Sequence, residues 1–120
     1  MNKVQNTKKY DLEERTYKLA KEIRDFIKEI PKNSSNNIYI SQLIRSSSSI
    51  GANFIEANEA LSKKDFYHRV KICRKEAKET EYWLLLIEVS SGLFLQKKLN
   101  YLIQEVGELM KIFGAIISKG

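Results

Sequence analysis

Hydrophobic residues recur along the chain at alternating steps of three and four, the spacing that puts side chains on one face of an α-helix. The pattern occupies four segments, and we expect helices over residues 11–30, 37–60, 63–90 and 95–118. In the third segment the apolar and small residues at this spacing are Phe66, Val70, Cys73, Ala77, Thr80, Leu84 and Ile87. The sequence therefore predicts an all-α fold in one domain, 1–120: an antiparallel, up-and-down four-helix bundle with left-handed, heptad-type packing.

Turn and capping residues separate the four segments. Pro31 cannot continue a helix, so it ends the first segment and opens a polar loop. Ser62 is expected to cap the third helix, with Asp65 at the position three residues later that often completes a capping pair. Ser90, Ser91 and Gly92 are expected to end that helix. The connections are short, which favours antiparallel neighbours.

The composition is that of an ordinary globular domain of 120 residues, with 42% hydrophobic and 30% charged side chains. No apolar run approaches the roughly 20 residues that span a bilayer, and residues 1–10 are polar, without a signal-like core. We expect residues 1–10 to be frayed. The single cysteine suits a reducing compartment. We therefore expect a cytoplasmic protein with no membrane partner.

The end of the third segment is apolar around most of the helix circumference. A helix that is apolar on more than one face is either central in a large protein or buried at an interface, and this chain is small. We therefore expect a homo-oligomer whose interface includes Tyr82, Trp83, Leu85 and Leu86. The alternative is a wide core face with scattered exposed apolar residues, which many monomers have.

Small and polar residues fill the middle of the second helix, where glycine and serine are usually sparse. Arg45, Ser49, Asn53 and Glu56 fall on overlapping rows of one helix face, and Glu79 of the third helix is a natural partner for them. Buried charges are costly unless they are paired, so these five residues are expected to form a structural polar network. The alternative is a solvated helix face.

Two stretches carry a family signature. Residues 45–57 follow the pattern R-x3-S-I-x2-N-x2-E-A, and residues 65–84 continue it with Asp-Phe, Cys-Arg and Glu-Thr-Glu-Tyr-Trp-Leu. These motifs resemble those of the bacterial four-helix-bundle proteins encoded in intervening sequences of 23S ribosomal RNA genes. Ala57 stands where that family typically has glycine. This departure predicts that the second helix continues past Ala57.

The resemblance has implications beyond the residues themselves. It implies a bundle that assembles as a ring, commonly a pentamer. It also implies kinship with the accessory protein of diversity-generating retroelements, a basic pentameric barrel that binds nucleic acid and a reverse transcriptase. It brings no catalytic residues.

Basic residues are concentrated in the first half of the third helix. Between residues 62 and 78 there are seven lysines and arginines against two acidic residues, which accounts for most of the net charge of +6. Such a cluster favours binding to a phosphate backbone, and an interleaved aromatic side chain can stack on bases. The candidate nucleic-acid-binding residues are Lys63, Lys64, Tyr67, Arg69, Lys71, Arg74, Lys75 and Lys78. The alternative is a solvated face that keeps the protein soluble.

The chain offers little for catalysis. A di-iron bundle needs Glu-x-x-His motifs on two helices, whereas His68 is the single histidine and has no glutamate three residues before it. Cys73 lies on the apolar seam, where it is expected to be a small buried residue. We therefore expect no enzyme, metal or cofactor. The function expected is a non-enzymatic module that binds RNA or DNA or assists a nucleic-acid enzyme, and the alternative is a protein-interaction scaffold without a nucleic-acid role.

Overall fold

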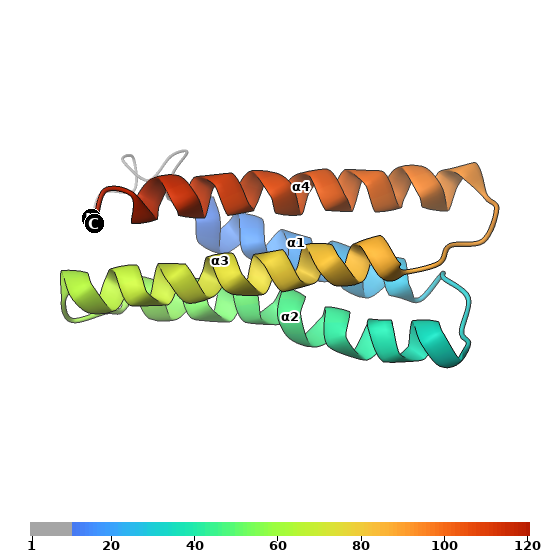
Figure 1. Ribbon diagram of the computed structural model, residues 1–120, viewed down its shortest axis with the longest axis horizontal. Coiled ribbons are helices and arrows are strands. Elements are labelled where there is room, and N and C mark those ends of the chain that lie inside the picture. The colour runs from blue at the N-terminus through green and yellow to red at the C-terminus, as the bar shows by residue number, and fades with distance from the viewer. Residues whose placement is uncertain (1–10) are drawn as a thin grey trace.

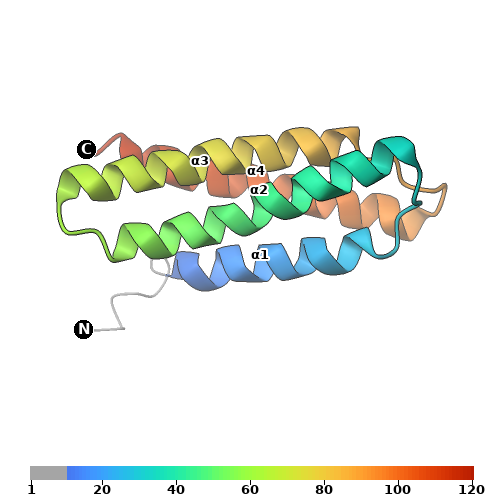
Figure 2. The same ribbon diagram turned by 90° about the horizontal axis from the view of Figure 1, so that it is seen from below.

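The computed structural model describes residues 11–120 as four helices: α1 (Leu12–Ile27), α2 (Ser34–Asn58), α3 (Lys63–Leu86) and α4 (Leu93–Ile117). Successive helices run antiparallel and lie side by side, and α4 returns to the vicinity of α1 (Figure 1, Figure 2). The predicted all-α four-helix bundle is confirmed. Assembly as a ring stays a prediction, and the expectation that residues 1–10 are frayed lies outside the described residues.

The core is formed by the residues that recur at steps of three and four. Each helix directs one such stripe inward, which removes apolar surface from water. The fully buried hydrophobic side chains include Leu19, Ile23, Leu43, Ile50, Val70, Leu84, Leu102, Leu109 and Phe113. Within residues 11–120, no helix is both long enough and apolar enough to cross a bilayer.

Side-chain caps fix the starts of the two central helices. The Ser62 hydroxyl accepts a hydrogen bond from the backbone N–H of Asp65 at 3.1 Å, so the predicted cap of α3 is confirmed. The Asn33 side chain accepts from the N–H of Asn36 at 2.9 Å in the same way. Because Asn33 is a good cap, α2 begins at Ser34, ahead of the expected start at 37.

A buried asparagine joins two loops at one end of the bundle. The Asn36 amide donates to the carbonyl oxygens of Pro31 (3.0 Å) and Glu88 (2.8 Å), and its oxygen accepts from the N–H of Glu88 at 3.0 Å. We refer to this arrangement as the Asn36 clip. Ile87 is already extended there (φ −60°, ψ 136°), so α3 ends at Leu86 rather than near residue 90.

Charged side chains connect α1 to α4. Arg15 Nε lies 2.7 Å from a carboxylate oxygen of Glu105, and Arg15 Nη2 lies 2.7 Å from Glu108. Farther along the same seam, the Tyr101 hydroxyl donates to Glu22 at 3.4 Å, and Lys98 Nζ lies 3.8 Å from the same carboxylate. Partly exposed pairs of this kind contribute little stability each, so apolar packing carries most of the fold.

Candidate functional site

One row of exposed residues runs along the outside of α3. We call it the outer row, and it consists of Lys64, His68, Lys71, Lys75, Lys78, Tyr82 and Leu85. Its steps of four and three keep all seven side chains on one face, and each of them is exposed. The first five form a basic half and the last two an apolar half. With a rise of about 1.5 Å per residue, the basic half extends about 21 Å.

Two acidic residues of α3, Glu76 and Glu79, point the other way, toward α2. Glu76 is only 9% exposed, and one of its carboxylate oxygens lies 3.2 Å from Arg45 Nη1. Arg45 also pairs with the half-buried Glu79. The structure thus brings together Arg45 and Glu79, two members of the expected network. The helix is electrostatically two-sided, since its inner carboxylates face an arginine while its outer cations face solvent.

The cations of the outer row are not neutralised within the part of the chain that the structure describes. There, Lys71, Lys75 and Lys78 form no ion pair. Lys63, Lys64 and Arg74 are exposed as well, and the Arg74 guanidinium reaches over α4 to within 3.9 Å of where a Cβ on Gly114 would lie. Six of the eight residues expected to bind nucleic acid are thus exposed cations: Lys63, Lys64, Lys71, Arg74, Lys75 and Lys78.

Two of the expected binding residues are oriented differently. Arg69 is half-buried, and its Nη1 donates to the Asn53 side-chain oxygen at 3.3 Å, so it belongs to the polar contact with α2. Tyr67 is half-buried and packs edge-on against Phe66, with 5.3 Å between ring centroids. Its ring also lies against Gly120. Tyr67 is therefore held by intramolecular contacts rather than free to stack on a base.

Four of the five residues expected in the polar network, Arg45, Ser49, Asn53 and Glu79, form side-chain polar contacts, and other residues join them at the seam between α2 and α3. Asn53 donates to the backbone oxygen and the hydroxyl of Ser49, at 2.9 and 3.0 Å. The Glu56 side chain is exposed and forms no hydrogen bond or ion pair with the described residues. The Thr80 and Ser46 hydroxyl oxygens, both fully buried, lie 2.9 Å apart. Sequence reasoning missed this pair, although Thr80 occupies a seam position.

The residues expected at an oligomer interface divide into two pairs. Tyr82 and Leu85 are 58% and 63% exposed. Trp83 and Leu86 are half-buried, and the Trp83 ring stacks on Tyr39 of α2 with 6.2 Å between centroids. Of these four residues, Tyr82 and Leu85, the apolar half of the outer row, are thus the two that expose most of their surface to another molecule.

Cys73 has the properties of a core residue. It is fully buried, and its thiol donates to the Ile50 carbonyl oxygen at 3.4 Å. Burial raises the pKa of the Cys73 thiol to about 12, so the nucleophilic thiolate is absent at neutral pH. Within residues 11–120, no three His, Cys, Asp or Glu side chains are grouped as a metal site would require.

Comparison with known proteins places these features in a family context. A family model described as 23S rRNA-intervening sequence protein matches residues 8–115. A solved structure from Bacteroides thetaiotaomicron VPI-5482, described as a protein of unknown function from the S23 ribosomal protein family, is 30% identical with a TM-score of 0.73. The alignment covers 88% of this chain and 96% of that one. No curated protein matches the chain.

Proposed function

The chain belongs to the 23S rRNA-intervening sequence protein family, as its motifs indicated, and from this premise we propose that it is a non-enzymatic protein that binds nucleic-acid backbones through the basic half of α3. The observation that carries the proposal is the separation of charge across this helix. Glu76 and Glu79 face Arg45, whereas Lys71, Lys75 and Lys78 face solvent in one row.

The dimensions of the basic half suit a phosphate backbone. Its length of about 21 Å corresponds to roughly six phosphates of one duplex strand, at about 3.4 Å each along the axis. Lysine ammonium groups act as point charges, and Tyr67 is occupied by intramolecular packing, so the surface has no evident means of distinguishing bases. The binding proposed here is therefore insensitive to sequence and strongly dependent on salt.

Self-association is the second part of the proposal. Besides Tyr82 and Leu85, the large exposed apolar side chains include Leu93 (68%) and Phe94 (71%) at the start of α4. Apolar surface of this kind is buried when copies of the chain associate. An oligomer, of which the pentamer is the form that the family resemblance implies, would present several basic rows at once and increase avidity for a long nucleic acid.

A paired-variant experiment tests the nucleic-acid proposal. The test variant is Lys71→Gln/Lys75→Gln/Lys78→Gln, and the matched control changes three exposed lysines elsewhere, Lys18, Lys97 and Lys111, in the same way. Both variants lose three positive charges. Affinity for a fluorescein-labelled single-stranded RNA of mixed sequence is measured by anisotropy from 50 to 300 mM salt.

We expect the test variant to bind at least about tenfold more weakly at 50 mM salt, and the control to remain within about threefold of wild type. Loss of three phosphate contacts should also reduce the slope of log affinity against log salt by about two. Equal losses in the two variants would show that only total charge matters, which would contradict the proposed site. Circular dichroism establishes that both variants remain folded.

A further inference from the structure

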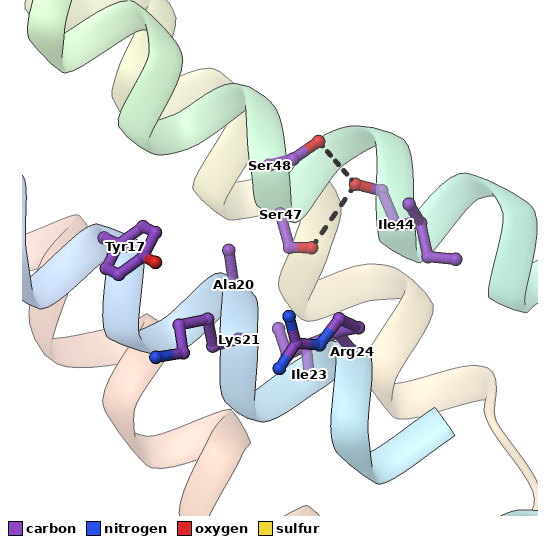
Figure 3. Close-up of a pocket in the computed structure, with 8 residues that line it drawn as sticks. All are labelled: Tyr17, Ala20, Lys21, Ile23, Arg24, Ile44, Ser47 and Ser48. Atoms are coloured by element: carbon purple, nitrogen blue, oxygen red, sulfur yellow. Dashed lines mark hydrogen bonds between the residues drawn. The ribbon is translucent and has the colours of Figure 1, made fainter. Parts of the chain in front are cut away.

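A groove of about 240 Å³ lies between α1 and α2 (Figure 3). Its lining includes Tyr17 and Ala20 from α1 and Ile44 and Ser48 from α2. The groove is smaller than the roughly 300–1,000 Å³ typical of sites for drug-sized molecules. Its size therefore suits one or two protein side chains rather than a cofactor.

The groove is apolar in spite of its serines. Both hydroxyls, those of Ser47 and Ser48, donate back to the Ile44 carbonyl oxygen of their own helix, at 3.5 and 2.7 Å (Figure 3). Their donor capacity is used within α2, so they present few polar groups to an occupant. Tyr17 (63% exposed) and Ile44 (46% exposed) leave apolar surface uncovered on the two sides.

Divergence of the two helices opens this groove. At Gly51 the helices touch, since a Cβ there would lie only 2.9 Å from Thr16 Oγ1. From that point α2 moves away from α1 toward its own N-terminal end (Figure 2). Wider side chains would be needed to fill the resulting gap, and the chain has Ala20, Ser47 and Ser48 there.

The rim of the groove is positively charged. Lys21 and Arg24 line it, Lys28 continues the same row of α1, and Asp25 pairs with Arg24 and Lys28. On the other wall, residues 34–44 of α2 contain no charged residue. A well-matched occupant would therefore combine apolar side chains with carboxylates.

The chain itself carries such a surface. In the apolar half of α3, the exposed Tyr82 and Leu85 are accompanied by the half-buried Glu81, and the exposed Glu88 follows two residues after the helix ends at Leu86. We infer that the α1–α2 groove of one copy receives Tyr82 and Leu85 of a second copy, with Glu81 and Glu88 near Lys21 and Arg24. This inference rests on the self-association proposed above and specifies the two surfaces that meet.

We infer that this contact is heterologous, with each pair of copies meeting through one groove and one α3 end, rather than a two-fold dimer in which two copies fill each other's grooves. Tyr82 and Leu85 of each copy can then bind the groove of one neighbour, while its own groove binds these residues of another neighbour. The assembly can therefore extend beyond a dimer. The basic half of α3 is not part of the contact and stays exposed. The outer row would thus serve assembly at one end and nucleic-acid binding at the other.

A charge exchange tests the pairing. The variants are Lys21→Glu/Arg24→Glu in the groove, Glu81→Lys/Glu88→Lys at and just beyond the end of α3, and a chain with all four changes. Masses are measured by light scattering over a concentration series, with circular dichroism as the control for folding. Each double variant should associate at least about tenfold more weakly, because like charges then face each other, and the fourfold variant should regain most of the affinity.

If the fourfold variant associates no more tightly than the two double variants, the pairing is overturned, even if wild type associates and binds RNA normally. A second measurement tests whether the groove and the docking residues meet each other, and the mass of the wild-type assembly, above that of a dimer, tests the heterologous geometry. Ile44→Arg blocks the groove and Leu85→Arg blocks the docking residues, so an equimolar mixture should form 1:1 dimers while each variant alone remains monomeric. A mixture that stays monomeric overturns the inference. A wild-type mass of 14.0 kDa, that of one chain, would also overturn the inference. It would contradict the proposed self-association as well, but it would not bear on the proposed RNA binding, which the anisotropy experiment tests separately.

Discussion

The two sides of α3 use charge in opposite ways. On the side facing α2, Glu76 and Thr80 are buried and bonded to partners on α2. On the outer side, Lys75 and Lys78 are exposed and unpaired among the described residues. Neighbours in the sequence therefore have different roles, since a buried polar group must find a partner within the protein whereas an exposed cation can bind an external one.

This difference separates stability from binding. Substitutions on the inner side should lower the free energy of unfolding and leave the intrinsic affinity of the folded protein for RNA unchanged. Substitutions on the outer side should leave the free energy of unfolding nearly unchanged and weaken binding to RNA or to another copy of the chain. Adjacent residues on the two sides form matched pairs, and these pairs test the distinction at nearly identical positions along the helix.

The largest contrast is expected between Leu84→Ala and Leu85→Ala. Leu84 is fully buried, so its truncation leaves a cavity and should cost about 2–5 kcal/mol of unfolding free energy. Leu85 is 63% exposed, and its truncation should cost less than about 0.5 kcal/mol while weakening self-association. Urea unfolding and light scattering on both variants measure the two effects. Similar unfolding losses would show that the apolar half is part of the core.

A smaller contrast is expected between Glu76→Ala and Lys75→Ala. Loss of Glu76 should cost about 1–2 kcal/mol, less than the roughly 3–5 of a fully buried pair, because Arg45 is half-exposed and keeps Glu79. Lys75→Ala should change stability by less than about 0.5 kcal/mol and weaken RNA binding. Thermal unfolding and anisotropy distinguish these results. If Glu76→Ala is as stable as wild type, the ion pair between Glu76 and Arg45 makes no net contribution to the free energy of unfolding.

The smallest effect concerns pH and the Cys73 thiol. Because burial raises its pKa from 9.0 to about 12, the unfolded chain releases this proton at lower pH than the folded one. The thiol's contribution to stability is complete below about pH 8 and is lost as pH rises from about 9 to 12. Relative to Cys73→Ala, wild type should lose about 0.8 kcal/mol at pH 9.5. If the unfolding free energies of wild type and Cys73→Ala change in parallel between pH 7 and 10, this prediction is wrong.

Hydrophobic spacing was sufficient to predict the four helices and the core, because burial of one stripe per helix is a local property of the sequence. The direction of Glu76 was also accessible, since it lies three residues after Cys73 and four before Thr80 on the inner side. Counting Glu76 only as a charge within the basic segment concealed its pairing with Arg45. Helix phase rather than net charge determines which residues a partner meets.

Other features depend on contacts between distant residues. The end of α3 at Leu86 follows from Ile87 becoming extended beside the Asn36 clip, which no local pattern indicates. The orientation of Tyr67 depends on its contact with Gly120, and that of Arg69 on its hydrogen bond to Asn53. Both side chains were plausible ligands for nucleic acid by composition, and tertiary contacts engage them instead.

The Asn36 clip has a consequence for the kinetics of folding. Its bonds to Glu88 join residues 52 positions apart and need both loops in place. They join the start of α2 to the end of α3, at the open end of the α2–α3 hairpin, so we expect them to form after the two helices have paired. Interactions that are absent from the transition state act on the unfolding rate. We expect Asn36→Ala to accelerate unfolding with little change in the folding rate, so the clip would prolong the lifetime of the folded chain.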